Sequence, residues 1–281
     1  MRTRKRLAVV LAVATTLGVM YSTLSPTGTA QKRVHSDTPV LTAGTRPLTP
    51  GPPAGWRLAF DPGFGGSQLN TSVWATCFVW AEPSVGCTNF GNRDELEWYL
   101  PSQDRVSHGV LDLTAQRVAT AGRTSRGRAK EYSCRSGMIT SYPSFQFTYG
   151  YVQVTARIPR AFGLWSAFWL VDAEQQWPPD IDIMDHWGAT DTGVYFHPAR
   201  GTQVGAHLKT ADLAQGWHTF GLSWTASRLT WFIDGREVMS TDSGVPREPM
   251  YFIANLADYQ LSATAGCHGS LLIKSVKVWR P

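Results

Sequence analysis

Alternation between apolar and polar residues dominates the chain from residue 55 to residue 281. Val152, Val154 and Ala156 alternate with polar neighbours, and the stretches 218–224 and 271–279 repeat the same period of two. This period places every second side chain on one face of a β-strand. Helical periodicity is scarce, so the pattern predicts many short strands.

One hairpin is predicted with particular clarity. The apolar run Leu229–Ile233 is followed by Asp234 and Gly235 and then by a second run, Arg236–Met239. Asp-Gly accommodates the positive φ angles that a two-residue hairpin turn requires. Together with the turn residues between the other short strands, this pattern predicts an all-β sandwich that forms one domain over residues 55–281.

The first 54 residues have a different composition. Residues 1–6 carry four basic side chains, the run Leu7–Met20 has no charge, and Gly28-Thr29-Ala30 ends in small residues. This is the pattern of a signal peptide over residues 1–30, and the apolar run is shorter than the about 20 residues that span a bilayer. We therefore expect a secreted, extracellular protein, with a membrane anchor by an uncleaved signal as the alternative. The proline-rich residues 31–54 predict an extended linker.

Most of the net positive charge lies in this N-terminal segment. The whole chain has a net charge of +5, which would suit a nucleic acid or another polyanion as partner. Four of the 26 basic residues lie in residues 1–6, however, and the other 22 nearly balance the 21 acidic residues. A nearly neutral, aromatic-rich domain favours a neutral polysaccharide over nucleic acid as its partner, and we expect no stable membrane insertion after signal removal.

The four cysteines fit an exported protein. Cys77, Cys87, Cys134 and Cys267 form no CxxC pair and no metal-like spacing with histidine. Disulfides are common in oxidising compartments. We expect a local Cys77–Cys87 bridge and a long-range Cys134–Cys267 bridge, and the alternative is that some of these residues remain buried thiols.

Three aspartates within six residues are the candidate chemistry. In a regular strand Asp180 and Asp182 would share a face and Asp185 would point away, but one bulge residue between Asp182 and Asp185 brings all three to the same face. Their like charges must raise at least one pKa, and a protonated acid beside an ionised one can cleave a glycoside. The alternatives are a solvated face or a calcium site.

Aromatic residues surround these acids, and flat rings suit stacking on sugars, although some are expected to be ordinary core. The tryptophans that flank the acids are Trp165, Trp169, Trp177 and Trp187.

The segment WPPDIDIMDHWG at 177–188 resembles the signature of glycoside hydrolase family 16, the laminarinase and lichenase group. That signature is Glu-x-Asp-x-(x)-Glu, often preceded by Trp-Pro-Pro. Segments in the family's order extend the resemblance over nearly all of residues 55–281: 55–74, 94–99, 136–159, 163–170, 216–238 and 249–258. The resemblance implies a concave, concanavalin A-like jelly-roll sandwich and substrates of β-1,3 or mixed β-1,3/1,4 glucan.

The resemblance also assigns roles to the acids. Asp180 would be the nucleophile, Asp185 the general acid/base, and Asp182 the residue that orients the nucleophile. The substrate-binding candidates are Trp177, Trp165, His197, Asn255 and Asp94. His197 matches a region where the family often has a histidine near the acid/base, with a surface histidine as the alternative. Asn255 is either a cleft-facing amide or a cap at a strand end.

This chemistry needs no cofactor, and a structural calcium ion stays compatible with the sequence. We expect a monomer.

The chain departs from the family where activity depends on it. Aspartate replaces glutamate at both catalytic positions, which shortens each side chain by roughly 1.5 Å. Retaining pairs of carboxyl groups lie about 5–5.5 Å apart and inverting pairs about 6.5–9.5 Å, so shorter side chains favour the wider arrangement. Met138 also stands where the family often has arginine. Three hypotheses stay open: an active glycosidase, a non-catalytic carbohydrate-binding protein on a hydrolase scaffold, and a cation site.

Overall fold

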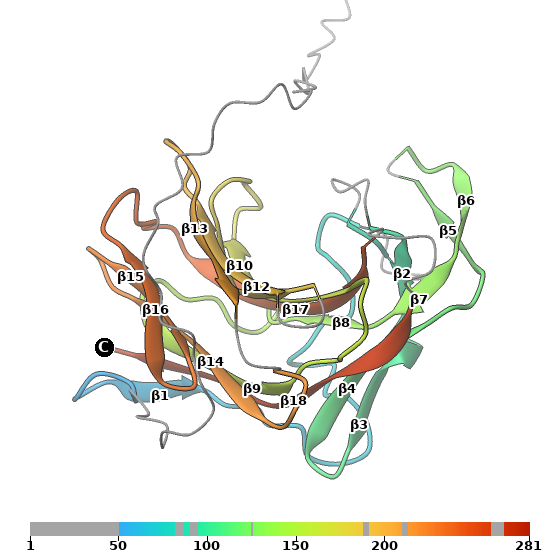
Figure 1. The fold of residues 1–281 in the computed structure, drawn as a ribbon, viewed down its shortest axis with the longest axis horizontal. Helices are drawn as coiled ribbons and strands as arrows, with labels where there is room; N and C mark the ends of the chain where they lie inside the picture. Colours follow the sequence, from blue (N-terminus) through green and yellow to red (C-terminus); the bar gives the residue numbers. More distant parts are fainter. Residues whose placement is uncertain are drawn as a thin grey trace, which may run out of the picture. The chain divides into compact units, whose positions relative to one another are not determined.

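The structure of the protein is a computed structural model. It describes residues 51–81, 87–89, 95–124, 126–187, 191–209, 213–259 and 267–281. The expected signal peptide, most of the expected linker and Asp94 lie outside the described residues. Two large sheets and one two-stranded ribbon make up the fold (Figure 1). No helix in the described ranges is long and apolar enough to cross a membrane.

The larger sheet has ten strands in the described part of the chain. Its main path runs in the order β16-β15-β14-β9-β18-β4-β7-β2, while β1 pairs with β18 and β3 pairs with β4. Its strands are β1 (Arg57–Phe60), β2 (Glu97–Tyr99), β3 (Asp104–Ser107), β4 (Val110–Gln116), β7 (Cys134–Ser136), β9 (Gly150–Arg157), β14 (His218–Trp224), β15 (Leu229–Ile233), β16 (Arg236–Thr241) and β18 (His268–Arg280).

The smaller sheet has six strands in the order β13-β12-β11-β10-β17-β8. They are β8 (Met138–Thr140), β10 (Leu164–Asp172), β11 (Asp180–His186), β12 (Asp191–His197), β13 (Val204–Lys209) and β17 (Met250–Asp258). A separate ribbon pairs β5 (Thr120–Arg123) with β6 (Ala129–Tyr132), and a short 3-10 helix covers Pro101–Gln103.

The core forms where the apolar faces of the two sheets meet, as the alternating pattern predicts. In β4 every second residue is buried, and Phe168 of the smaller sheet lies 5.6 Å from Phe220 of the larger sheet, measured between ring centroids. The all-β sandwich predicted from the sequence is confirmed. The predicted hairpin is confirmed as well, with positive φ angles of 49° at Asp234 and 77° at Gly235.

Strand β11 contains the predicted bulge. Across β10, Phe168 pairs with Met184 and Trp169 pairs with Asp182, so Ile183 is the extra residue, and the register against β12 shifts at the same place. The indole N–H of Trp231, from β15 of the opposite sheet, donates to the backbone carbonyl of Asp182 at 2.9 Å. This contact holds the bulged backbone against the core.

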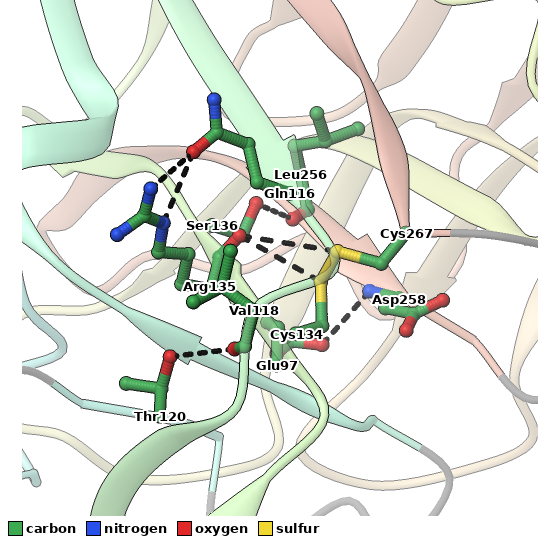
Figure 2. Close-up of a disulfide and its surroundings, with 10 residues drawn as sticks. All are labelled: Glu97, Gln116, Val118, Thr120, Cys134, Arg135, Ser136, Leu256, Asp258 and Cys267. Atoms are coloured by element: carbon green, nitrogen blue, oxygen red, sulfur yellow. Dashed lines mark hydrogen bonds between the residues drawn. A yellow bond between two sulfur atoms is a disulfide. The ribbon is translucent and has the colours of Figure 1, made fainter.

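The cysteines divide into one disulfide and two thiols. Cys134, at the start of β7, is bonded to Cys267, which immediately precedes β18, as predicted (Figure 2). The predicted Cys77–Cys87 bridge is wrong, because both residues are buried free thiols. The backbone of Cys87 pairs with Tyr99, and its sulfur lies 3.7 Å from the sulfur of Met138. Burial raises the pKa of the Cys87 thiol well above its usual value, which keeps it protonated.

Candidate active site

The three aspartates lie on the face of the smaller sheet that points away from the core. Asp180, Asp182 and Asp185 all come from β11, and because Ile183 is accommodated in the bulge, they share this face. Their exposed fractions are only 5%, 9% and 4%. Three acids that water hardly reaches therefore lie side by side.

The neighbouring strands place small residues beside Asp185. Ala167 of β10 lies on one side of it and Gly193 of β12 on the other. Asp182 lies between two aromatic residues, Trp169 and Tyr195. The ring of Tyr195 covers Gly193, so Asp185, which is 4% exposed, is the most buried of the three acids.

Three of the predicted substrate-binding residues contact the acids: Trp165, His197 and Trp177, whose side chain is hydrogen-bonded to Asp180. The indole N–H of Trp165 donates to Oδ1 of Asp185 at 2.8 Å, and Nε2 of His197 lies 3.6 Å from Oδ2 of Asp182. The sequence placed His197 near the acid/base; in the structure it lies against the central aspartate and also interacts electrostatically with Asp180 and Asp185. Trp177 is 66% exposed, and its ring centroid lies 5.9 Å from that of His197.

Burial raises the pKa of every acid in the cluster. The pKa of Asp182 rises to about 7 through burial. The pKa of Asp180 rises to about 8, through burial first and the charge of Asp182 second. Burial also raises the pKa of Asp185 well above its usual value, and the charges of both other aspartates raise it further. Asp185 is therefore the acid best suited to keep its proton.

Asn255 is placed to position other side chains more than to contact a substrate. It pairs with Ala167 across β17 and β10, so it shares the face of the acids, but it is only 5% exposed. Its Oδ1 accepts a hydrogen bond from Trp169 at 2.9 Å, and its Nδ2 donates to the hydroxyl of Tyr99 at 3.1 Å. Asn255 thus fixes Trp169, the neighbour of Asp182.

Tyr195 is a residue that the sequence reasoning missed. A Cβ atom at Gly193 or at Gly205 would come within 2.4 Å and 2.1 Å of its ring, so the ring occupies the space that two side chains would otherwise fill. Glycine at both positions lets the tyrosine lie over the sheet beside Asp182. Glycines that alternate with an aromatic residue on one strand and face it from the next were the available signal.

An aromatic group borders the acids on the side of Asp185. The ring of Trp187 lies 5.9 Å from that of Trp165 and 5.5 Å from that of His207, against which it stacks at 19°. Tyr259 lies 5.7 Å from Trp165 on the other side. Trp165 and Trp187 therefore form part of this face, and the buried aromatic residues of the core are a separate set.

Asp180, Asp182 and His197 are also the residues that could hold a cation. Each offers one ligand atom, and these atoms lie within 4.8 Å of one another. Carboxylate and imidazole ligands suit a divalent transition metal. A cation held there would occupy the carboxylate that must attack a substrate.

Residues 94–268 match the family described as Glycosyl hydrolases family 16. An endo-1,3-1,4-beta-glycanase of Rhizobium meliloti is 34% identical over 217 residues, which cover 70% of this chain and 45% of that protein. A second endo-1,3-1,4-beta-glycanase of the same organism is 32% identical over 216 residues, with the same coverage. The chain spans about half the length of these relatives.

The fold is also found among solved structures. The endo-beta-1,3-glucanase from Pyrococcus furiosus superposes with a TM-score of 0.69 at 22% identity, covering 80% of this chain and 94% of that chain. At this identity the similarity establishes the jelly-roll fold, in agreement with the strand order described above.

Proposed function

The chain belongs to family 16 of the glycosyl hydrolases, and from this premise we propose that it is a secreted glycosidase acting on β-1,3 or mixed β-1,3/1,4 glucans. The observation that carries the proposal is the set of three buried aspartates on one sheet face, with Trp177 exposed beside them. Proteins named as beta-glycanases and beta-glucanases are among its relatives, which supports a glucan as substrate.

The proposed reaction uses two of the aspartates directly. Ionised Asp180 attacks the anomeric carbon while Asp185 gives its proton to the departing glycosidic oxygen. Asp185 then takes a proton from water, whose oxygen displaces Asp180 and completes hydrolysis. Asp182 and His197 act through Asp180. Asp182 orients the Asp180 carboxylate, and the positive charge of a protonated His197 favours the ionised form of Asp180. No step requires a cofactor.

Hydrolysis of laminarin and of a mixed-linkage β-glucan by the purified protein tests this proposal. We expect new reducing ends from at least one of them, and no loss of activity in EDTA. Binding of both polymers without cleavage from pH 5 to pH 9 would instead establish a non-catalytic carbohydrate-binding protein. Proton NMR of the first-formed anomer reports the course: the β anomer means attack by Asp180, and the α anomer means that Asp180 activates water.

The pKa values predict an unusual pH profile. Attack requires ionised Asp180, and since its pKa is raised to about 8, kcat/KM should rise with pH through the neutral range instead of near pH 4. The alkaline decrease follows where Asp185 loses its proton. Initial rates on laminarin between pH 4 and pH 10 measure both limbs, which belong to the coupled cluster as a whole.

Asp182→Asn provides the control for this profile. The charge of Asp182 raises the pKa of Asp180, so removing that charge should move the acidic limb to lower pH while lowering the maximal rate. An acidic limb near pH 4 in the unmodified protein would contradict the expected profile.

Trp177→Ala should weaken catalysis without weakening the fold. An indole that is 66% exposed contributes little to packing, but its ring is available to a sugar beside Asp180. Loss of a stacking contact should lower kcat/KM on laminarin about tenfold. Steady-state kinetics and thermal unfolding measure the two effects.

Two matched variants interpret that result. Trp177→Phe keeps a ring and should retain most of the activity. Trp217→Ala removes an indole that is 42% exposed and directly precedes β14 of the other sheet, so its kcat/KM should equal that of the unmodified protein. Equal losses in the Trp177→Ala and Trp217→Ala variants would rule out a specific role for Trp177.

A further inference from the structure

Residues 117–132 concentrate positive charge on one small element, here called the basic arm. The basic arm comprises the ribbon β5–β6 and the residues that lead into it. Within these residues there is one acidic side chain, Glu131, and there are five basic ones: Arg117, Arg123, Arg126, Arg128 and Lys130. The rest of the chain after residue 30 has 17 basic and 20 acidic residues, so the near-neutral total conceals a strongly cationic segment.

The basic arm is anchored at its base. The ring of Tyr132 lies 5.0 Å from that of Trp98 in β2, and its hydroxyl donates to the carbonyl of Arg123 at 2.7 Å. Gly122 lies so close to Trp98 that a Cβ atom there would come within 2.7 Å of the indole. The ribbon is therefore held by aromatic packing, and its charged side chains project from a fixed base.

The cations of the basic arm are available to a ligand. Arg123, Arg126, Arg128 and Lys130 are all exposed, and none of them forms an ion pair with a carboxylate of the described residues. The ammonium group of Lys130 lies 4.1 Å from the centre of the Tyr132 ring, and Arg123 donates to the carbonyl of Gly127 at 3.1 Å. Both contacts leave donors directed to solvent.

The basic arm is connected through one short strand to the sheet that carries the acids. Strand β6 leads through β7 into β8, the edge strand of the smaller sheet, where Met138 pairs with Asn255. Burial raises the pKa of Asp258, the residue before Tyr259, and the charge of Arg117 at the start of the arm partly opposes that rise. Figure 1 shows β5 and β6 rising next to β2 and β7 at one end of the sandwich. Charges act over about 8 Å at physiological salt, so the arm would attract acidic groups of a polymer that extends from the sheet toward it.

We propose that the basic arm binds acidic substituents of the polysaccharide whose backbone lies over Asp180 and Asp185, so that the substrate is an anionic β-glucan-type polymer. This inference rests on the proposed function and narrows its substrate class. A neutral glucan would gain no charge–charge attraction from the four exposed cations of the arm, which pair with no carboxylate of the described residues. A single-stranded nucleic acid would use exposed rings for stacking. The aromatic residue of the arm is Tyr132, at the end of β6, and it is buried against Trp98.

Carboxymethylated mixed-linkage β-glucan and its unsubstituted parent of equal length are the probes for this proposal. Equilibrium binding is measured with the full chain carrying Asp185→Asn, so that turnover does not enter. Arm residues 123, 126, 128 and 130 are changed to Gln in one variant. The matched control changes four exposed cations of β1, β3 and β18 in the larger sheet to Gln: Arg57, Arg105, Lys274 and Arg280.

At low ionic strength we expect the carboxymethylated polymer to bind about tenfold more tightly than its parent, and this preference to decrease with added salt. The arm variant should lose the preference and keep its affinity for the parent, while the control variant should keep both. An equal preference in the arm and control variants would overturn the proposal. Arm-dependent binding to phosphatidylglycerol vesicles, with no preference between the two glucans, would also overturn the proposal. Absence of hydrolysis in the unmodified protein would refute the proposed function and leave this binding result independent of it.

Discussion

Asp180→Asn is expected to lower kcat on laminarin by about 10⁴-fold, since an amide cannot attack the anomeric carbon and the covalent step is lost. Asp185→Asn should cause a comparable loss on laminarin, whose leaving group needs a proton, but a much smaller loss on an aryl β-glucoside with an acidic leaving group. Initial rates on the two substrates separate these effects. Azide then identifies the role of each residue by the anomer that it forms.

With Asp180→Asn, azide should enter from the side that the aspartate occupied and give the α-glycosyl azide. With Asp185→Asn, it should displace Asp180 from the glycosyl-enzyme and give the β-glycosyl azide. Full activity in either variant would remove that residue from the mechanism. Failure to fold is excluded by thermal unfolding at two pH values.

The pKa of Asp180 determines how the stability difference between the Asp180→Asn variant and the unmodified protein changes with pH. Its value is about 8 in the folded protein and near 3.9 in the unfolded chain, so its contribution to stability is present below pH 4 and is lost as the pH rises to 8. Asparagine does not titrate. The Asp180→Asn variant should therefore gain stability relative to the unmodified protein at pH 8 and not at pH 4, which identifies the buried acid as a feature maintained at the expense of stability.

The sequence was sufficient to predict the sandwich and the bulge in β11 because both follow from local rules. Alternation assigns a face to each side chain, and three acids can share a face only if one residue is extra. The contacts that surround the acids were not accessible in this way. Asn255 forms a hydrogen bond with Tyr99, which lies 156 positions away in the sequence. No local sequence pattern shows which side chains so far apart in the chain come into contact.

The prediction for Cys77 and Cys87 shows the same limit, whereas the predicted Cys134–Cys267 bridge is confirmed. Spacing favoured a Cys77–Cys87 bridge, and the two thiols do interact with each other, but they are not bonded, and the Cys87 sulfur also lies 3.7 Å from the sulfur of Met138. Likewise, the balance of charges in the composition favoured a neutral ligand, and such a total carries no information on where in the structure the charges lie. Composition describes the whole chain, whereas recognition depends on which charges lie together.

Removal of the Cys134–Cys267 disulfide should lower the free energy of unfolding by about 3 to 5 kcal/mol. The bond closes a loop across 133 positions, and in the chain-entropy description a long loop restricts the unfolded chain strongly. It also joins β7 to the start of β18, the 13-residue strand that pairs with β4 and β9 in the larger sheet (Figure 2). Guanidinium unfolding of a variant with Ala at both positions, followed by tryptophan fluorescence, measures the loss.

The two free thiols supply the control for this measurement. A variant with Ala in place of Cys77 and Cys87 loses some packing, but it keeps the long-range bond, so dithiothreitol should still lower its unfolding midpoint. The variant that lacks Cys134 and Cys267 should show no response to dithiothreitol, because the bond that the reagent cleaves is absent. If dithiothreitol lowers the midpoint of that variant as much as it lowers the midpoint of the unmodified protein, the reducible bond lies elsewhere and the stabilising role of Cys134–Cys267 is contradicted.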